Sequence, residues 1–126
     1  MPLLPVMHQF IPMIESGRKI HTIRKERKYP FKVGQSLFLY TDSRTSKAKF
    51  QFKKPLYFLY HVSIDPKLLT VLLDGLPMSM RQIKDLAYHD GFDDQFAFFR
   101  FFERYTPDVC KTDLRLLCWE FPSYLF

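Results

Sequence analysis

The stretch "GRKIHTIRKERK", residues 17–28, determines much of how this chain is organised. Gly17 is expected to end a short helix over residues 9–16, because glycine readily adopts the left-handed conformation of a helix C-cap. Residues 20–25 show a strand-like alternation of apolar and polar side chains and are rich in β-branched residues, which predicts a strand. We therefore predict that the turn and the strand bring their cations and the Thr22 hydroxyl into one concave pocket.

The positive charge is concentrated in one part of the chain. Residues 18–54 hold twelve Lys and Arg against two acids, a balance of +10, whereas the remainder has a balance of −4, and the net charge is +6. Such an asymmetry is typical of a surface that binds phosphates, since neutralising them releases counterions. A charged face that only keeps the protein in solution is the alternative.

Length and composition predict one domain over residues 1–126. The 126 residues are 47% hydrophobic and 17% aromatic, enough for a single core. The N-terminus lacks a cationic leader and no apolar run approaches the roughly 20 residues of a membrane span, so we expect a soluble, cytoplasmic protein. Cys110 and Cys118 are expected to stay reduced, with a disulfide as the alternative. The histidines are scattered along the sequence, so we predict no metal site, and we predict no cofactor.

The remaining pattern predicts an α+β fold. Further strands are expected over residues 36–40, 56–64, 68–73 and 114–121, which gives five or six strands, and residues 41–49 form a polar loop. Ser79 and Gln82 form a capping-box signature for a helix that runs to about Tyr88. Several strands with segregated helices suggest a small, partly closed barrel.

A second helix is predicted over residues 93–105, with Asp93 as its N-cap. Its aromatic side chains cover more than half of its circumference, which favours a buried core helix; an interface with a protein partner or in a homodimer is the alternative. Gln95 falls on the inward side of this helix, where a polar group needs a hydrogen bond or borders a cavity.

Several motifs, taken in order, resemble the ASCH domain family. They are Gly17-Arg18-Lys19, Thr22-Ile23-Arg24, "KVGQSLFLY" (32–40), "DSRT" (42–45), "DLAYHDGF" (85–92) and "LLCWEF" (116–121). The resemblance implies a small PUA-like β-barrel of five to six strands with flanking α-helices. It also implies an RNA- or nucleotide-related role, with a positively charged cleft, of the kind found in bacteria and phages.

The resemblance also implies candidate catalytic residues. Some ASCH proteins are amidohydrolases that remove the acetyl group of N4-acetylcytidine, at least one acts as a ribonuclease, and many have no established activity. By position, the lysine of the amidohydrolases matches Lys19 and their nucleophilic threonine matches Thr22. Their acidic residue falls around Gln95, which is a departure, because an amide cannot take up a proton as a carboxylate does.

The residues themselves suggest a chemistry for this pair. A threonine hydroxyl needs a base, and a neutral lysine can serve if burial and like charges lower its pKa from about 10.4 to about 7. Arg18, Arg24 and Lys25 are candidates for that repulsion and for binding an oxyanion. A regular strand would point Lys19 and Thr22 apart, so we predict that Lys19 belongs to the turn after Gly17.

Two main hypotheses follow. The first is a non-enzymatic domain that binds RNA or a nucleotide; the second is an amidohydrolase with Lys19 as base, Thr22 as nucleophile and Arg24 or Gln95 orienting the carbonyl. A ribonuclease, or a phage-encoded module that binds a protein through the aromatic helix, is a further alternative. The predicted binding residues are Arg18, His21, Arg24, Lys25, Tyr40 and Arg44. For His21 and Tyr40 the alternative is packing within the fold, and for Arg44 it is an ordinary loop charge.

Overall fold

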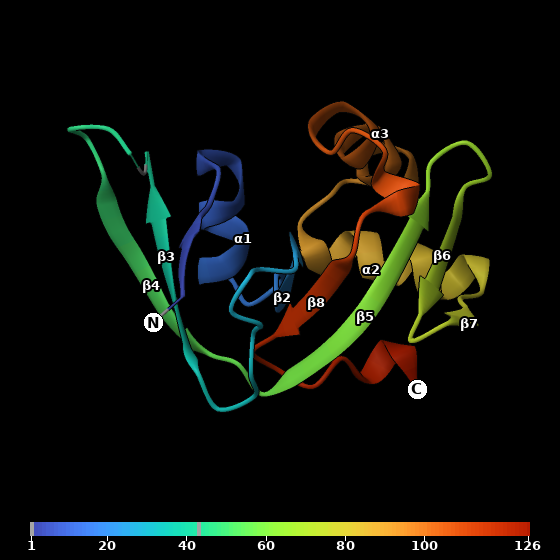
Figure 1. Cartoon of the computed structure of the whole chain (residues 1–126), viewed down its shortest axis with the longest axis horizontal. Helices are drawn as coiled ribbons and strands as arrows, with labels where there is room; N and C mark the ends of the chain where they lie inside the picture. The colour runs from blue at the N-terminus through green and yellow to red at the C-terminus, as the bar shows by residue number, and fades with distance from the viewer. Residues whose placement is uncertain (1, 43) are drawn as a thin grey trace.

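The computed structural model describes residues 2–42 and 44–126 and has a mixed α+β fold with two sheets (Figure 1). The three-stranded sheet has the order β1-β3-β4, with β1 at Leu3–Pro5, β3 at Ser36–Thr41 and β4 at Lys49–Pro55. The five-stranded sheet has the order β2-β8-β5-β6-β7, with β2 at His21–Lys25, β5 at Phe58–Asp65, β6 at Thr70–Leu73, β7 at Leu76–Pro77 and β8 at Leu114–Cys118.

The described residues contain eight strands, so the prediction of five or six was too low. The strand β4 was missed because its sequence, KFQFKKP, is rich in lysine and has no β-branched residue. The strands β1 and β7 are three and two residues long, too short to show a period. The predicted polar loop ends where β4 begins, at Lys49.

The strand β8 is an interior strand of the larger sheet and pairs antiparallel with β2 and with β5. Its Leu116, Leu117 and Cys118 are fully buried, as expected for a strand that is covered on both faces. The free Cys118 lies in this core, whereas the free Cys110 is exposed. The predicted strands over residues 20–25 and 114–121 are thus confirmed, although β8 ends at Cys118.

The smaller sheet diverges from the larger one, with α1 between them (Figure 1). The strand β3 pairs in parallel with β1 and antiparallel with β4, with an irregularity between Leu39 and Tyr40. Its side chains alternate, since Leu37, Leu39 and Thr41 are buried whereas Phe38 and Tyr40 are partly exposed. One face of this sheet therefore packs inward and the other faces outward.

Within residues 2–42 and 44–126, three α-helices accompany the sheets: α1 at Ile11–Glu15, α2 at Met80–Asp90 and α3 at Gln95–Tyr105. Single 3₁₀ turns lie at His8–Phe10, Val109–Lys111 and Ser123–Leu125. The capping box of Ser79 and Gln82 is present, as predicted. The predicted cap of α3 was wrong by one residue: Asp94, not Asp93, accepts the Ala97 N–H at 2.7 Å, the three-residue spacing that an N-cap needs.

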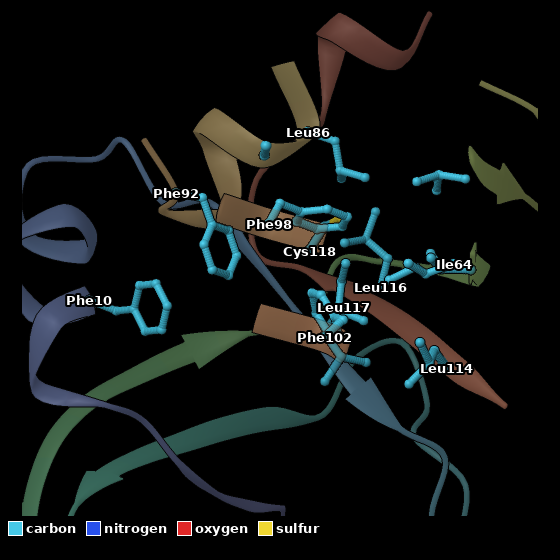
Figure 2. Close-up of a cluster of buried hydrophobic side chains, with 14 of the residues drawn as sticks. Phe10, Ile64, Leu86, Phe92, Phe98, Phe102, Leu114, Leu116, Leu117 and Cys118 are labelled. Carbon is cyan, nitrogen blue, oxygen red and sulfur yellow. The ribbon is translucent and has the colours of Figure 1, made fainter. Parts of the chain in front are cut away.

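The aromatic helix α3 contributes to the core, as the pattern favoured. Phe98, Phe99 and Phe102 are buried, and Figure 2 shows Phe98 and Phe102 close to the leucines of β8. On the other side of Phe98, Phe92 packs edge-on against the ring of Phe10, which extends the core to the 3₁₀ turn before α1. The core thereby holds α1, α3 and the larger sheet together.

Candidate functional site

A cleft of about 620 Å³ lies between the segment that follows β1, the strand β2 and the helix α3. Its wall includes four polar residues of the stretch 17–28, namely Lys19, Thr22, Arg24 and Lys25, together with Asp90. Aromatic side chains of α3 and its approach, Phe92, Phe101, Phe102 and Tyr105, complete it. The predicted concave pocket thus holds the hydroxyl and three of the cations, Lys19, Arg24 and Lys25, but not Arg18.

Lys19 is buried in this cleft, with 3% of its surface exposed. Its Nζ donates to the backbone oxygen of Asp90 at 2.5 Å and lies 3.3 Å from the carboxylate Oδ1 of the same residue. Burial lowers the pKa of Lys19, the charge of Asp90 opposes that effect, and the charge of Arg24 adds to it. The environment therefore favours a neutral amine more than water does. Arg18 and Lys25 were also predicted to repel this lysine, but of these three cations it is Arg24 that lowers its pKa.

The position of Lys19 before β2 explains how its side chain and that of Thr22 can point toward the same cleft. Lys19 precedes β2 and its backbone N–H donates to the carbonyl of Met13 at 2.9 Å. It thus belongs to the turn after Gly17, as predicted, and its direction is not set by the pleat of the strand. Lys19 and Thr22 consequently line the same cleft.

The Thr22 hydroxyl already accepts one hydrogen bond. Arg24 Nε donates to Thr22 Oγ1 at 3.1 Å. Burial lowers the pKa of Arg24 to about 10, with the charge of Asp90 opposing, so this guanidinium remains a cation at neutral pH. Because the donor occupies a lone pair of Oγ1, the hydroxyl proton stays available for a base, and negative charge on the oxygen is stabilised.

The buried carboxylate of the cleft comes from Asp90, which sequence reasoning did not select. Asp90 is the last residue of α2 and is 3% exposed. Ending the predicted helix at about Tyr88 concealed it; the apolar stripe through Leu86 and Ala87 continues onto position 90 at spacings of four and three. Gln95, proposed for the acidic position, begins α3, is partly exposed and is not one of the cleft-lining residues.

His21 lies behind the cleft and holds Asp90. Its Nδ1 is 3.0 Å from Asp90 Oδ1 and its Nε2 is hydrogen-bonded to the hydroxyl of Tyr124. His21 is completely buried, and burial lowers its pKa, with Asp90 opposing. The carboxylate accepts from Nδ1–H, so Nε2 of the neutral ring accepts from the tyrosine. His21 is thus packed within the fold.

The C-terminal 3₁₀ turn supplies Tyr124 to this network. The ring of Tyr124 stacks on His89 with centroids 4.9 Å apart, and His89 Nδ1 lies 3.1 Å from the backbone oxygen of Arg18. Burial raises the pKa of the Tyr124 hydroxyl. The end of the chain therefore supports the turn that carries Lys19, a long-range relation that no local motif could reveal.

The remaining predicted binding residues lie elsewhere. The guanidinium of Arg18 donates to the carbonyls of Tyr88 and Phe92 at the end of α2 and lies 4.2 Å from the Tyr88 ring centroid. Tyr40 packs on Phe50, away from the cleft, and the exposed Arg44 follows β3 with a φ of +69°. Of the six predicted binding residues, the structure brings only Arg24 and Lys25 to the cleft.

Comparison of the chain with protein-family models, with curated proteins and with solved structures found no match. Within residues 2–42 and 44–126, no group of three or more His, Cys, Asp or Glu side chains is arranged to hold a metal ion. None of the helices in this part of the chain has the length and apolar character needed to cross a membrane.

Proposed function

We propose that this protein is an ASCH-type amidohydrolase that removes the acetyl group from N4-acetylcytidine or a closely related acylated cytidine, on a small, partly closed PUA-like barrel. The observation that carries the proposal is the buried Lys19 amine, next to the Asp90 carboxylate, in the same cleft as the Thr22 hydroxyl. A nucleophile, a base with a lowered pKa and a group that orients the base are the parts that covalent amide hydrolysis needs.

In the first step, neutral Lys19 Nζ accepts the proton of Thr22 as Oγ1 bonds to the acetyl carbon. The guanidinium of Arg24 stabilises the negative charge that develops on oxygen. Lys19 then gives the proton to the N4 nitrogen as the carbon–nitrogen bond breaks, which releases cytidine and leaves an acetyl ester on Thr22. Water, deprotonated by Lys19, hydrolyses that ester, so that acetate leaves and the hydroxyl is restored.

The carboxylate of Asp90 holds Lys19 in place through this cycle. Its Oδ1 accepts from His21 and lies 3.3 Å from the amine of Lys19, and so it fixes the amine at the cleft wall. It also keeps the protonated lysine paired after the first proton transfer. We therefore propose that Asp90, and not Gln95, takes the role of the acidic residue of the ASCH amidohydrolases.

The test is acetate release from N4-acetylcytidine by the purified protein and by Thr22→Ala and Thr22→Ser. We expect turnover that Thr22→Ala abolishes and Thr22→Ser retains in part, since only the serine keeps a hydroxyl. Circular dichroism establishes that both variants are folded. Mass spectrometry of the quenched reaction should detect the acetyl ester on Thr22. Equal turnover by Thr22→Ala and the unchanged protein would exclude this nucleophile.

A nucleotide- or RNA-binding domain without turnover is the second candidate. The observation in its favour is that Arg24 and the exposed Lys25 line the same cleft, since a free nucleoside has no phosphate to attract them. This candidate predicts binding of cytidine monophosphate that weakens with salt and no acetate release. Lys25→Gln would weaken that binding.

A further inference from the structure

The outward face of the three-stranded sheet carries three aromatic rings and a lysine. They are Phe38 and Tyr40 from β3 and Phe50 and Lys53 from β4, and we call this group the outer face. The alternation of β3 sends Leu37 and Leu39 to the core, and so its other side chains point outward. None of the four residues lines the cleft.

The outer-face rings lie next to one another. The Tyr40 and Phe50 centroids are 5.4 Å apart, those of Phe38 and Phe50 are 6.3 Å apart, and the Lys53 amine lies 5.8 Å from the Phe38 centroid. Phe50 is 48% exposed. The rings thus form one continuous surface, with a positive charge beside it.

The surroundings of the outer face are positive. Lys53 lies on this face, and the exposed Lys47 precedes β4; Lys49, which pairs with the buried Thr41, is exposed but projects from the opposite face. The acid near this end of the sheet is Asp42, whose carboxylate bonds to His8 at 2.9 Å and lines the cleft instead. A partner of the outer face therefore meets cations and exposed aromatic rings together, which complements an anionic polymer with flat, apolar groups.

We propose that the outer face binds single-stranded nucleic acid, with bases stacked on Tyr40, Phe50 and Phe38 and phosphates near Lys53. Alternate residues of a strand lie about 6.8 Å apart, so that Phe38 and Tyr40 can each take a different base. Aromatic rings on an open sheet with flanking cations are a recurrent way to hold unpaired bases. A duplex hides the faces of its bases and fits this surface less well. The inference goes beyond the proposed hydrolysis, because it uses none of the cleft residues.

The experiment measures fluorescence anisotropy of labelled single-stranded oligonucleotides of about 12 nucleotides. RNA, DNA and the corresponding RNA duplex are compared between about 50 and 200 mM salt. The ring variants are Tyr40→Leu and Phe50→Leu, which keep an apolar side chain but remove the aromatic face, and the charge variant is Lys53→Gln. The matched controls are Phe126→Leu and Lys67→Gln, an exposed ring and an exposed lysine outside the smaller sheet.

We expect single strands to bind and the duplex to bind more weakly. Each ring variant should weaken binding about 5- to 100-fold, and Lys53→Gln should reduce the salt slope by about 0.7, while the controls change neither. The RNA and DNA arms show which sugar is preferred. The proposal is overturned if no single strand binds at the lowest salt, if the duplex binds as tightly as the single strand, or if Tyr40→Leu and Phe50→Leu have the affinity of the unchanged protein.

Discussion

The cleft and the outer face both combine lysine with aromatic rings, yet their physical settings are opposite. In the cleft, Lys19 is buried beside the Asp90 carboxylate, with its amine 4.8 Å from the Phe10 centroid. On the outer face, Lys53 is exposed and lies 5.8 Å from the Phe38 centroid. Burial favours the neutral amine in the first setting, whereas solvent supports the charge in the second. The same pair of residue types thus suits proton transfer in one region and attraction of anions in the other.

The difference has its origin in the two sheets. Both β2 and β4 are edge strands of their sheets, but α2 packs against β2, so that the residues at its start are enclosed. In the smaller sheet, β4 is an edge strand with β3 as its neighbour, and its outward side chains face solvent. The elements that cover a strand, more than residue type or position in the sheet, therefore decide which cations are buried and which face solvent.

The largest effect is expected from removing the buried amine. Lys19→Met keeps the length and apolar stem of the side chain but removes the base, and we expect hydrolysis of N4-acetylcytidine to fall about 1,000-fold. For the unchanged protein, kcat/KM should rise with pH, with a midpoint below about 10.4, because the neutral amine is the active form and burial lowers its pKa. Steady-state acetate release across pH measures both.

The matched variant for that experiment is Lys53→Met on the outer face. It removes an exposed lysine and should leave kcat, KM and the pH profile unchanged. Equal losses from the two variants would contradict the division between the cleft and the outer face, and so would a Lys19→Met enzyme with full activity.

The next effect concerns two glycines with positive φ. At Gly91, φ is +104° and an added Cβ would lie 2.7 Å from Cδ1 of the buried Phe10, whereas at Gly34, φ is +98° and nothing lies within 4 Å. Gly34→Ala should therefore cost only backbone strain, about 1–2 kcal/mol. Gly91→Ala adds the displacement of Phe10 and should cost about 3–4 kcal/mol in the free energy of unfolding, measured in urea.

A smaller cost at Gly91 than at Gly34 would show that the packing beneath the cleft yields readily. The position of Gly91 also has a local consequence, since it directly follows Asp90 and ends α2. We expect Gly91→Ala to reduce hydrolysis as well as stability, whereas Gly34→Ala, which lies just before β3, should leave hydrolysis unchanged.

Local patterns predicted the parts of the molecule whose signals lie within a few residues. The Gly17 turn, the strand after it and the Ser79 capping box are examples. The pairing of Lys19 with Thr22 came from the resemblance to the ASCH family, and the Gly17 turn made a shared pocket possible. Asp90 was not found because its partners, Lys19 and His21, lie 71 and 69 positions away. The strand β4 was not found although residues 49–53 alternate, because its three lysines and its proline do not favour a strand.

Acid should expose the difference between buried and exposed histidines. Burial lowers the pKa of His21 below the ordinary 6.5, so the unfolded chain takes up this proton first, and stability falls as pH drops through the window below 6.5. This one group contributes a slope of up to about 1.4 kcal/mol per pH unit. Urea unfolding of His21→Gln between pH 4 and 7, a range of about 3 units, should lack that contribution. The exposed His61→Gln should keep it; an unchanged slope for His21→Gln would mean that the buried ring is already protonated when folded.

The smallest effect is expected on the outer face itself. Phe50 is exposed and pairs across the strands with Tyr40, a contact that contributes up to about 1 kcal/mol, so Phe50→Ala should cost less than that in the free energy of unfolding. Phe98→Ala, in the core, should cost about 3–5 kcal/mol. Urea unfolding of the two variants tests the contrast. A cost for Phe50 that approaches that of Phe98 would mean that the outer-face rings are retained for folding, whereas a small cost would support a role for these partly exposed rings in binding.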